Sequence, residues 1–210
     1  MNLTGNFDKM MKEILANYPD YSDHEYITFG ILIVDPRQPD TKAQITNHFS
    51  HFDTKSAGYF NFFIPGFRQD EISEHHYKIR GVTHYFDEEL WYDFCDEFCR
   101  RFNIAYPYNP TLILMTMQKS NINTAEYIVL ELDNNYRNNW NSIRRVGTLF
   151  EEIFEIARKT PDLKDIQMGL THTYVKSHLL NIVVSVFNRT WINEIAKSGG
   201  ELARYRIRVR

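Results

Sequence analysis

The sequence contains few cysteines, no long apolar run and no recognisable export signal. Its 210 residues include only Cys95 and Cys99, which argues against a disulfide-based fold and favours a reducing, cytoplasmic location. The first residues, MNLTGNFDKMMKEIL, lack the basic and apolar regions of a secretory signal. The longest apolar stretches, 29–34 and 179–187, are much shorter than the roughly 20 residues that cross a bilayer. We therefore predict no membrane span.

An excess of charge of one sign is also missing. The net charge is −3, from 24 basic and 27 acidic residues, so no global field attracts nucleic acid or an anionic membrane. A nucleic-acid partner would need a local basic patch and is not indicated. Aromatic residues, in contrast, are abundant at 15%, and we expect them mainly in the core, with an interface as the alternative.

Familiar catalytic motifs are absent as well. No Gly-x-Gly-x-x-Gly, Walker-type lysine loop, Gly-x-Ser-x-Gly elbow or His-Glu-x-x-His helix occurs in the sequence. Dinucleotide, nucleoside triphosphate, α/β-hydrolase and zincin chemistries therefore lack their usual signatures. No cofactor is expected.

The first third of the chain predicts a helix followed by a βαβ unit. Apolar residues at helical spacing predict an N-terminal helix with its cap at Thr4. Residues 25–34 form a nearly continuous β-branched and aromatic run, typical of a central strand covered on both faces. A helix from Asp40 or Thr41 and a strand over 59–64 follow, so the two strands should be parallel neighbours.

The middle of the chain predicts further helices and an antiparallel pair. Residues 68–81 are polar and typical of a long connection, with a short strand near 77–82. The other predicted elements are a helix from Asp87 with an aromatic stripe, strands over 111–117 and 126–132, and a helix over 142–159.

The resulting element order, βαβαββα, is similar to the core of the thioredoxin-like fold. We expect an α/β fold with a three-layer mixed sheet, preceded by an N-terminal helix and followed by a C-terminal helical extension. Within that extension, residues 165–197 are apolar enough for one or two helices or for a helix and a strand. Nothing in the composition marks a domain boundary. A single domain over 1–210 is therefore predicted, with its core at about 25–160 and the extension at about 161–210.

The resemblance to the thioredoxin-like fold directs attention to the cysteines, because thiol chemistry in that fold uses Cys-x-x-Cys just after the first core strand. Residues 35–38 occupy that place and contain no cysteine. Cys95 and Cys99 lie instead in a predicted helix beside acidic residues, which raise a thiol pKa. Redox catalysis is disfavoured, and we expect both thiols to pack in the core.

Three polar groups have alternative interpretations as metal or catalytic sites. A zinc site formed by the two cysteines with His48 and His51 is disfavoured, because the predicted topology puts their helices on opposite faces of the sheet. The other two groups are expected to be a solvated loop rather than a metal or general-base site, and a solvated strand end rather than a nuclease-like Mg²⁺ site. The loop group consists of His75, His76 and His84 with Glu71 and Glu74. The strand-end group consists of Glu126, Glu131 and Asp133, with Lys55 or Lys119 as a possible companion.

A candidate ligand site follows from topology. Open α/β sheets bind ligands beyond the carboxyl ends of their parallel strands. Those ends carry Asp35, Arg37, Phe67 and Arg68, which we predict as the ligand-binding group. The alternative is simple strand termination with solvated arginines. No catalytic residue and no metal ligand is predicted.

The missing catalytic motifs and the high aromatic content together favour binding over catalysis. We expect a non-catalytic protein that binds a protein partner or forms one subunit of a small assembly of bacterial type, such as a homo-oligomer. The alternative is a metal-dependent enzyme on a phosphorylated or nucleic-acid substrate, in which Arg37 and Arg68 bind phosphate and Asp35 lies near the chemistry. A zinc-stabilised domain is a third, weaker hypothesis.

Overall fold

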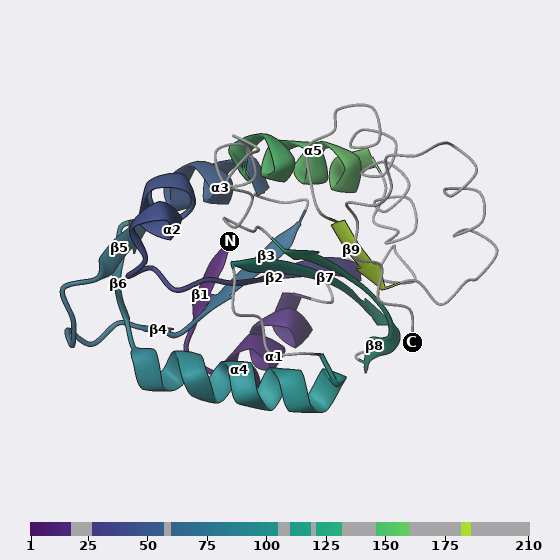
Figure 1. Cartoon of the computed structure of the whole chain (residues 1–210), viewed down its shortest axis with the longest axis horizontal. Coiled ribbons are helices and arrows are strands. Elements are labelled where there is room, and N and C mark those ends of the chain that lie inside the picture. Colours follow the sequence, from purple (N-terminus) through teal and green to yellow (C-terminus); the bar gives the residue numbers. More distant parts are fainter. Residues whose placement is uncertain are drawn as a thin grey trace.

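The computed structural model describes residues 1–17, 27–56, 60–104, 110–118, 121–131, 146–159 and 182–185. They form a mixed α/β fold with two sheets, of which the larger is mixed, and several helices (Figure 1). No helix among the described residues combines the length and apolar character needed to traverse a bilayer. The elements in chain order are β1 (Asn2–Thr4), α1 (Phe7–Asn17), β2 (Ile27–Ile33), α2 (Pro39–Gln44), the 3-10 helix η2 (Thr46–His48), α3 (Phe49–Ser56), β3 (Asn61–Pro65), β4 (Phe67–Arg68), β5 (His76–Ile79), β6 (Val82–Phe86), α4 (Glu88–Phe102), β7 (Thr111–Gln118), β8 (Asn121–Glu131), α5 (Val146–Lys159) and β9 (Ile182–Ser185).

The larger sheet has six strands in the order β1-β3-β2-β7-β8-β9. The first three are parallel to one another, and each later strand is antiparallel to the one before it. The expected βαβ unit is confirmed by the parallel pair of β2 and β3, in which Gly30 opposes Phe62. The expected antiparallel pair is confirmed by β7 and β8, whose register shifts between Met115 and Met117.

Helices cover both faces of this sheet. Figure 1 shows α1 and α4 below it and α2, α3 and α5 above it, so the fold has three layers. α4 carries Cys95 and Cys99, whereas His48 and His51 belong to η2 and α3. The two groups therefore lie on opposite faces, as the sequence predicts.

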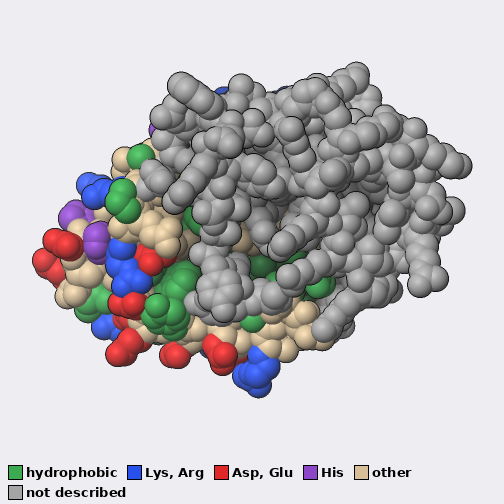
Figure 2. All heavy atoms as spheres, viewed as in Figure 1, with side chains coloured by type: hydrophobic (Ala, Val, Ile, Leu, Met, Phe, Trp, Pro, Cys, Tyr) green, Lys and Arg blue, Asp and Glu red, His purple; other side chains and the backbone are tan. Residues whose placement is uncertain are grey.

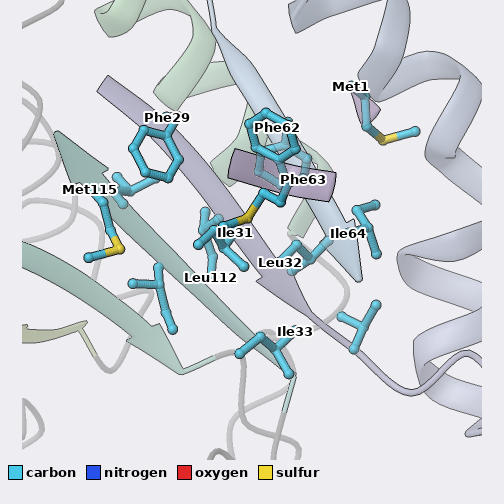
Figure 3. Packing of buried hydrophobic residues seen from close by; sticks show 14 of the residues in the cluster. Met1, Phe29, Ile31, Leu32, Ile33, Phe62, Phe63, Ile64, Leu112 and Met115 are labelled. Carbon is cyan, nitrogen blue, oxygen red and sulfur yellow. The ribbon is translucent and has the colours of Figure 1, made fainter. Parts of the chain in front are cut away.

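The core is built around β2. All of its residues are buried, which fits a strand that has neighbours on both edges and helices on both faces. Figure 3 shows the side chains of β2, β3 and β7 packed together, and the rings of Phe29 and Phe63 meet edge to face with centroids 6.2 Å apart. The largest fully buried side chains confirm that the core is aromatic; they include Phe29, Phe49, Phe52, Phe62, Phe63, Phe67, Phe94, Phe98 and Phe150.

Gly30, at the centre of β2, is required by this aromatic packing. A Cβ atom at this position would lie 2.9 Å from ring atoms of both Phe60 and Phe62. Both rings are buried, and close-packed interiors offer little room for them to move. Even a methyl group is therefore excluded from position 30 without rearrangement.

The first third of the chain differs from the predicted elements at two points. β1 precedes α1, and the helix is capped by Asn6, whose Oδ1 accepts a hydrogen bond from the backbone N of Lys9 at 2.9 Å, rather than by Thr4. Thr4 is buried in β1 instead, where it pairs with β3. The single helix expected after β2 is interrupted at Ile45, whose φ of −121° and ψ of −65° are not helical. Ile45 is fully buried, so the interruption places its side chain in the core.

The polar region after β3 contains a small sheet rather than a long connection. Its strand order is β4-β6-β5, and β5 and β6 form a hairpin. Arg80 and Gly81 join these strands with φ values of 50° and 82°, the left-handed conformations that a tight hairpin turn requires. The sequence signal for this turn, Arg-Gly, is weaker than the usual Asn-Gly because the first residue must adopt positive φ without glycine or asparagine.

The C-terminal extension predicted at 161–210 falls mostly outside the described residues. The segment that is described, β9, pairs with β8 as a strand, so the extension is not helical throughout. The β-branched residues Ile182, Val183 and Val184 explain the preference for a strand. The single-domain organisation stays a prediction.

An ion-pair cluster fastens the hairpin to α3. Asp53 of α3 is 8% exposed, and its carboxylate accepts hydrogen bonds from Arg80 Nε at 3.0 Å and Nη2 at 2.8 Å. The α-amino nitrogen of Met1 donates to the same carboxylate at 2.9 Å. Burial by itself would raise the pKa of Asp53, but these hydrogen bonds and charges outweigh burial and lower the pKa.

Gly30→Ala should destabilise the protein by about 1–3 kcal/mol, because the added methyl group overlaps the rings of Phe60 and Phe62. Urea unfolding followed by circular dichroism measures the change. Phe62→Leu makes room beside position 30, so the double variant should be more stable than the sum of the two single losses implies. Strictly additive losses would contradict the steric explanation.

Asp53→Asn should lower the free energy of unfolding by about 1–2 kcal/mol at pH 7, because it weakens the charged hydrogen bonds with Arg80. The folded-state pKa of Asp53 lies below the unfolded value of about 3.9, so its contribution is present above that value and is lost as pH falls through the folded pKa. Urea unfolding should therefore show the gap between wild type and variant closing at acid pH. Glu97→Gln, which breaks the exposed pair with Arg101, is the control and should cost less than about 0.5 kcal/mol. A gap that is independent of pH would refute the role of the charge.

Candidate functional site

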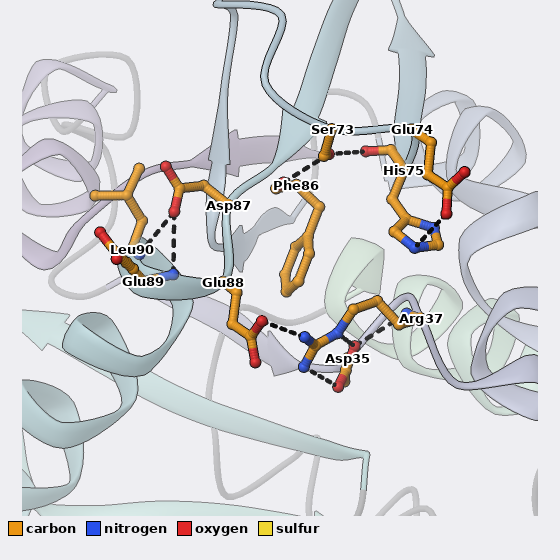
Figure 4. A network of polar contacts seen from close by, with 10 residues as sticks. All are labelled: Asp35, Arg37, Ser73, Glu74, His75, Phe86, Asp87, Glu88, Glu89 and Leu90. Atoms are coloured by element: carbon orange, nitrogen blue, oxygen red, sulfur yellow. Dashed lines mark hydrogen bonds and ion pairs between the residues drawn. The ribbon is translucent and has the colours of Figure 1, made fainter.

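The end of β2 leads into a loop in which Asp35 and Arg37 bind each other. Arg37 donates through its backbone N and its Nε, both 2.9 Å from Asp35 Oδ1, and through Nη2, 2.8 Å from Asp35 Oδ2. Figure 4 shows the side-chain pair below the Phe86 ring. The bond from the backbone N of Arg37 to the side chain two residues earlier is an Asx turn, so this loop closes on itself.

The Arg37 guanidinium also contacts α4. Its Nη1 pairs with the carboxylate of Glu88 in the first turn of the helix, and its Cζ lies 5.7 Å from the centroid of the Phe86 ring. The hydrogen bonds to Asp35 first, and to Glu88 second, raise the pKa of Arg37. Arg37 therefore stays cationic and links the loop after β2 to the start of α4 (Figure 4).

Arg68, at the end of β4, reaches the neighbouring acid. Its Nη1 lies 3.2 Å from Oδ2 of Asp87. The other oxygen of Asp87, Oδ1, accepts hydrogen bonds from the backbone N atoms of Glu89 and Leu90 at 3.0 and 3.2 Å, which caps α4. Asp87 and Glu88 are consecutive, so both predicted arginines meet at the beginning of one helix.

Phe67 lies in the core. It is fully buried, and its ring packs against those of Phe86, Tyr77 and Phe49 at centroid distances of 5.5, 5.8 and 6.3 Å. Packing alone explains an aromatic residue at this position. A ligand contact by Phe67 stays a prediction.

The Asp35 carboxylate is partly buried beside other titratable side chains. Burial would raise its pKa, but hydrogen bonds and charge from Arg37, with a smaller effect of His75, outweigh burial and lower the pKa. Burial raises the pKa of Tyr77, and the negative charge of Asp35 adds to this shift. Asp35 is thus ionised and paired at neutral pH, whereas a general base works best with a pKa near the operating pH.

The structure brings together Asp35, Arg37 and Arg68 but separates Phe67 from them. The partners that sequence reasoning did not include in the site are Asp87 and Glu88. The sequence feature that could have indicated Asp87 and Glu88 is the acidic start of a predicted helix. Carboxylates at such a position can cap backbone N–H groups and also bind cations. Nothing in the sequence pairs these acids with the arginines, since the contacts join segments that are distant along the chain.

The cysteines and the predicted metal-binding groups are the remaining candidates. Burial first, and the charge of Asp96 second, raise the pKa of Cys99 to about 11, as expected for a packing thiol beside an acid. Cys95 is buried on the same helix. Within the described part of the chain, no group of three or more His, Cys, Asp or Glu side chains is arranged to hold a metal ion. The side chains of the predicted acidic strand end, Glu126, Glu131 and Asp133, and that of Lys119 lie outside the described residues.

Comparison with known proteins adds no family. No protein-family model, no curated protein and no solved structure matches the chain. The structure therefore defines the class of the protein as mixed α/β with a mixed sheet, and its function has to be inferred from the residues of this chain.

Arg37→Met should destabilise the protein by about 2 kcal/mol at pH 7, because it leaves the partly buried Asp35 carboxylate without its cation. Adding Asp35→Asn removes the uncompensated charge and should recover part of the loss. The folded pKa of Asp35 is lowered, so the effect of Arg37→Met should shrink as pH falls through that pKa.

Thermal and urea unfolding at several pH values measure these effects. Lys42→Met removes an exposed cation on α2 and should change stability by less than about 0.5 kcal/mol. If Arg37→Met behaved like this control, the pairing would have no structural role.

Proposed function

We propose that the chain is a non-catalytic binding protein that associates with a protein partner or with further copies of itself. The observation that carries this proposal is the pairing of Arg37 with Asp35 and Glu88, and of Arg68 with Asp87. At the edge where many α/β enzymes bind a ligand, the charges neutralise one another and fasten a helix. Such an edge suits a rigid scaffold that presents its surface to a partner.

Exposed apolar side chains between β4 and the first half of α4 along the chain support association. Ile72 and Val82 are each 42% exposed, and Tyr92 is 49% exposed. Single exposed apolar residues are common on monomers, so the support comes from the occurrence of all three within one stretch of the chain, residues 72–92. Aromatic side chains such as Tyr92 are enriched where proteins bind each other.

The same proposal includes a thioredoxin-like scaffold without thiol chemistry, in a cytoplasmic protein. It is supported by the strand order β3-β2-β7-β8, by the parallel pair within it, and by helices on both faces. β1, the small sheet and β9 are additions to the βαβαββα order. Residues 35–38 provide no thiol, and the raised pKa of Cys99 is unsuited to a reactive thiolate.

A metal-dependent enzyme on a phosphorylated or nucleic-acid substrate is the alternative. It requires Arg37 or Arg68 to bind phosphate and Asp35 to lie near the chemistry. Both arginines already pair with carboxylates, so this edge offers little surplus positive charge to a phosphate group. Binding to a protein is therefore the better-supported function.

The purified protein should form a defined homo-oligomer or retain a specific protein partner. Size-exclusion chromatography with light scattering measures the mass, and cross-linking with mass spectrometry identifies the contacts. A strict monomer that retains no partner would refute the proposal.

Assays with Mg²⁺ or Mn²⁺ on nucleotides and polynucleotides test the alternative, and no turnover is expected. Turnover that is lost in Asp35→Ala and Arg68→Ala, but kept in the exposed control Lys42→Ala, would favour the enzyme.

A further inference from the structure

No further inference is drawn: the strongest candidate, the exposed stripe of Glu89, Asp93 and Asp96 along the outer face of α4 (lower edge of Figure 2), is an acidic cluster for which no second observation among the described residues points to a ligand.

Discussion

The complete burial of β2 is the constraint on which the rest of this structure depends. A strand with no exposed residue needs neighbours on both edges and helices on both faces, and the chain supplies them from segments before and after it. The packing is aromatic and close, so it leaves position 30 no room for a side chain. The direction of β2 then determines where the polar loop at its carboxyl end emerges.

That loop shows how the core and the surface are connected. Asp35 and Arg37 follow directly from β2, and Arg37 reaches Glu88 beside the cap residue Asp87, which in turn holds Arg68. Charged residues at this edge therefore align the sheet with a helix that packs on its lower face (Figure 1). The same charges satisfy one another, so this edge carries little unpaired charge.

Local patterns predict the elements whose residues determine their own structure. β2 and β7 have continuous apolar runs, and α4 combines an aromatic stripe with a cap at Asp87, so all three are evident from the sequence. The features that the sequence does not reveal depend on distant partners. Thr4 looks like a helix cap until β1 pairs with β3, and the helix after β2 breaks where Ile45 enters the core.

In the candidate site, too, the local contacts could be predicted from the sequence and the long-range contacts could not. The bond between Asp35 and Arg37 is local and could be anticipated from an Asp-Pro-Arg loop, since an aspartate side chain commonly accepts a backbone N–H two residues later. The contacts of these arginines with α4 join segments far apart in sequence and depend on the tertiary structure. Phe67 shows the converse case, because its neighbours Gly66 and Arg68 suggest a surface turn while its ring lies in the core.

The environment of the two cysteines has a practical consequence for labelling. At neutral pH a thiol with a pKa of about 11 is almost entirely protonated, so Cys99 reacts slowly with maleimides, and Cys95 is shielded by burial. A cysteine introduced on an exposed strand would therefore react selectively in the otherwise native sequence. We therefore expect the natural thiols, slowed by the packing of α4, to allow site-specific fluorophores on the surface without first being removed.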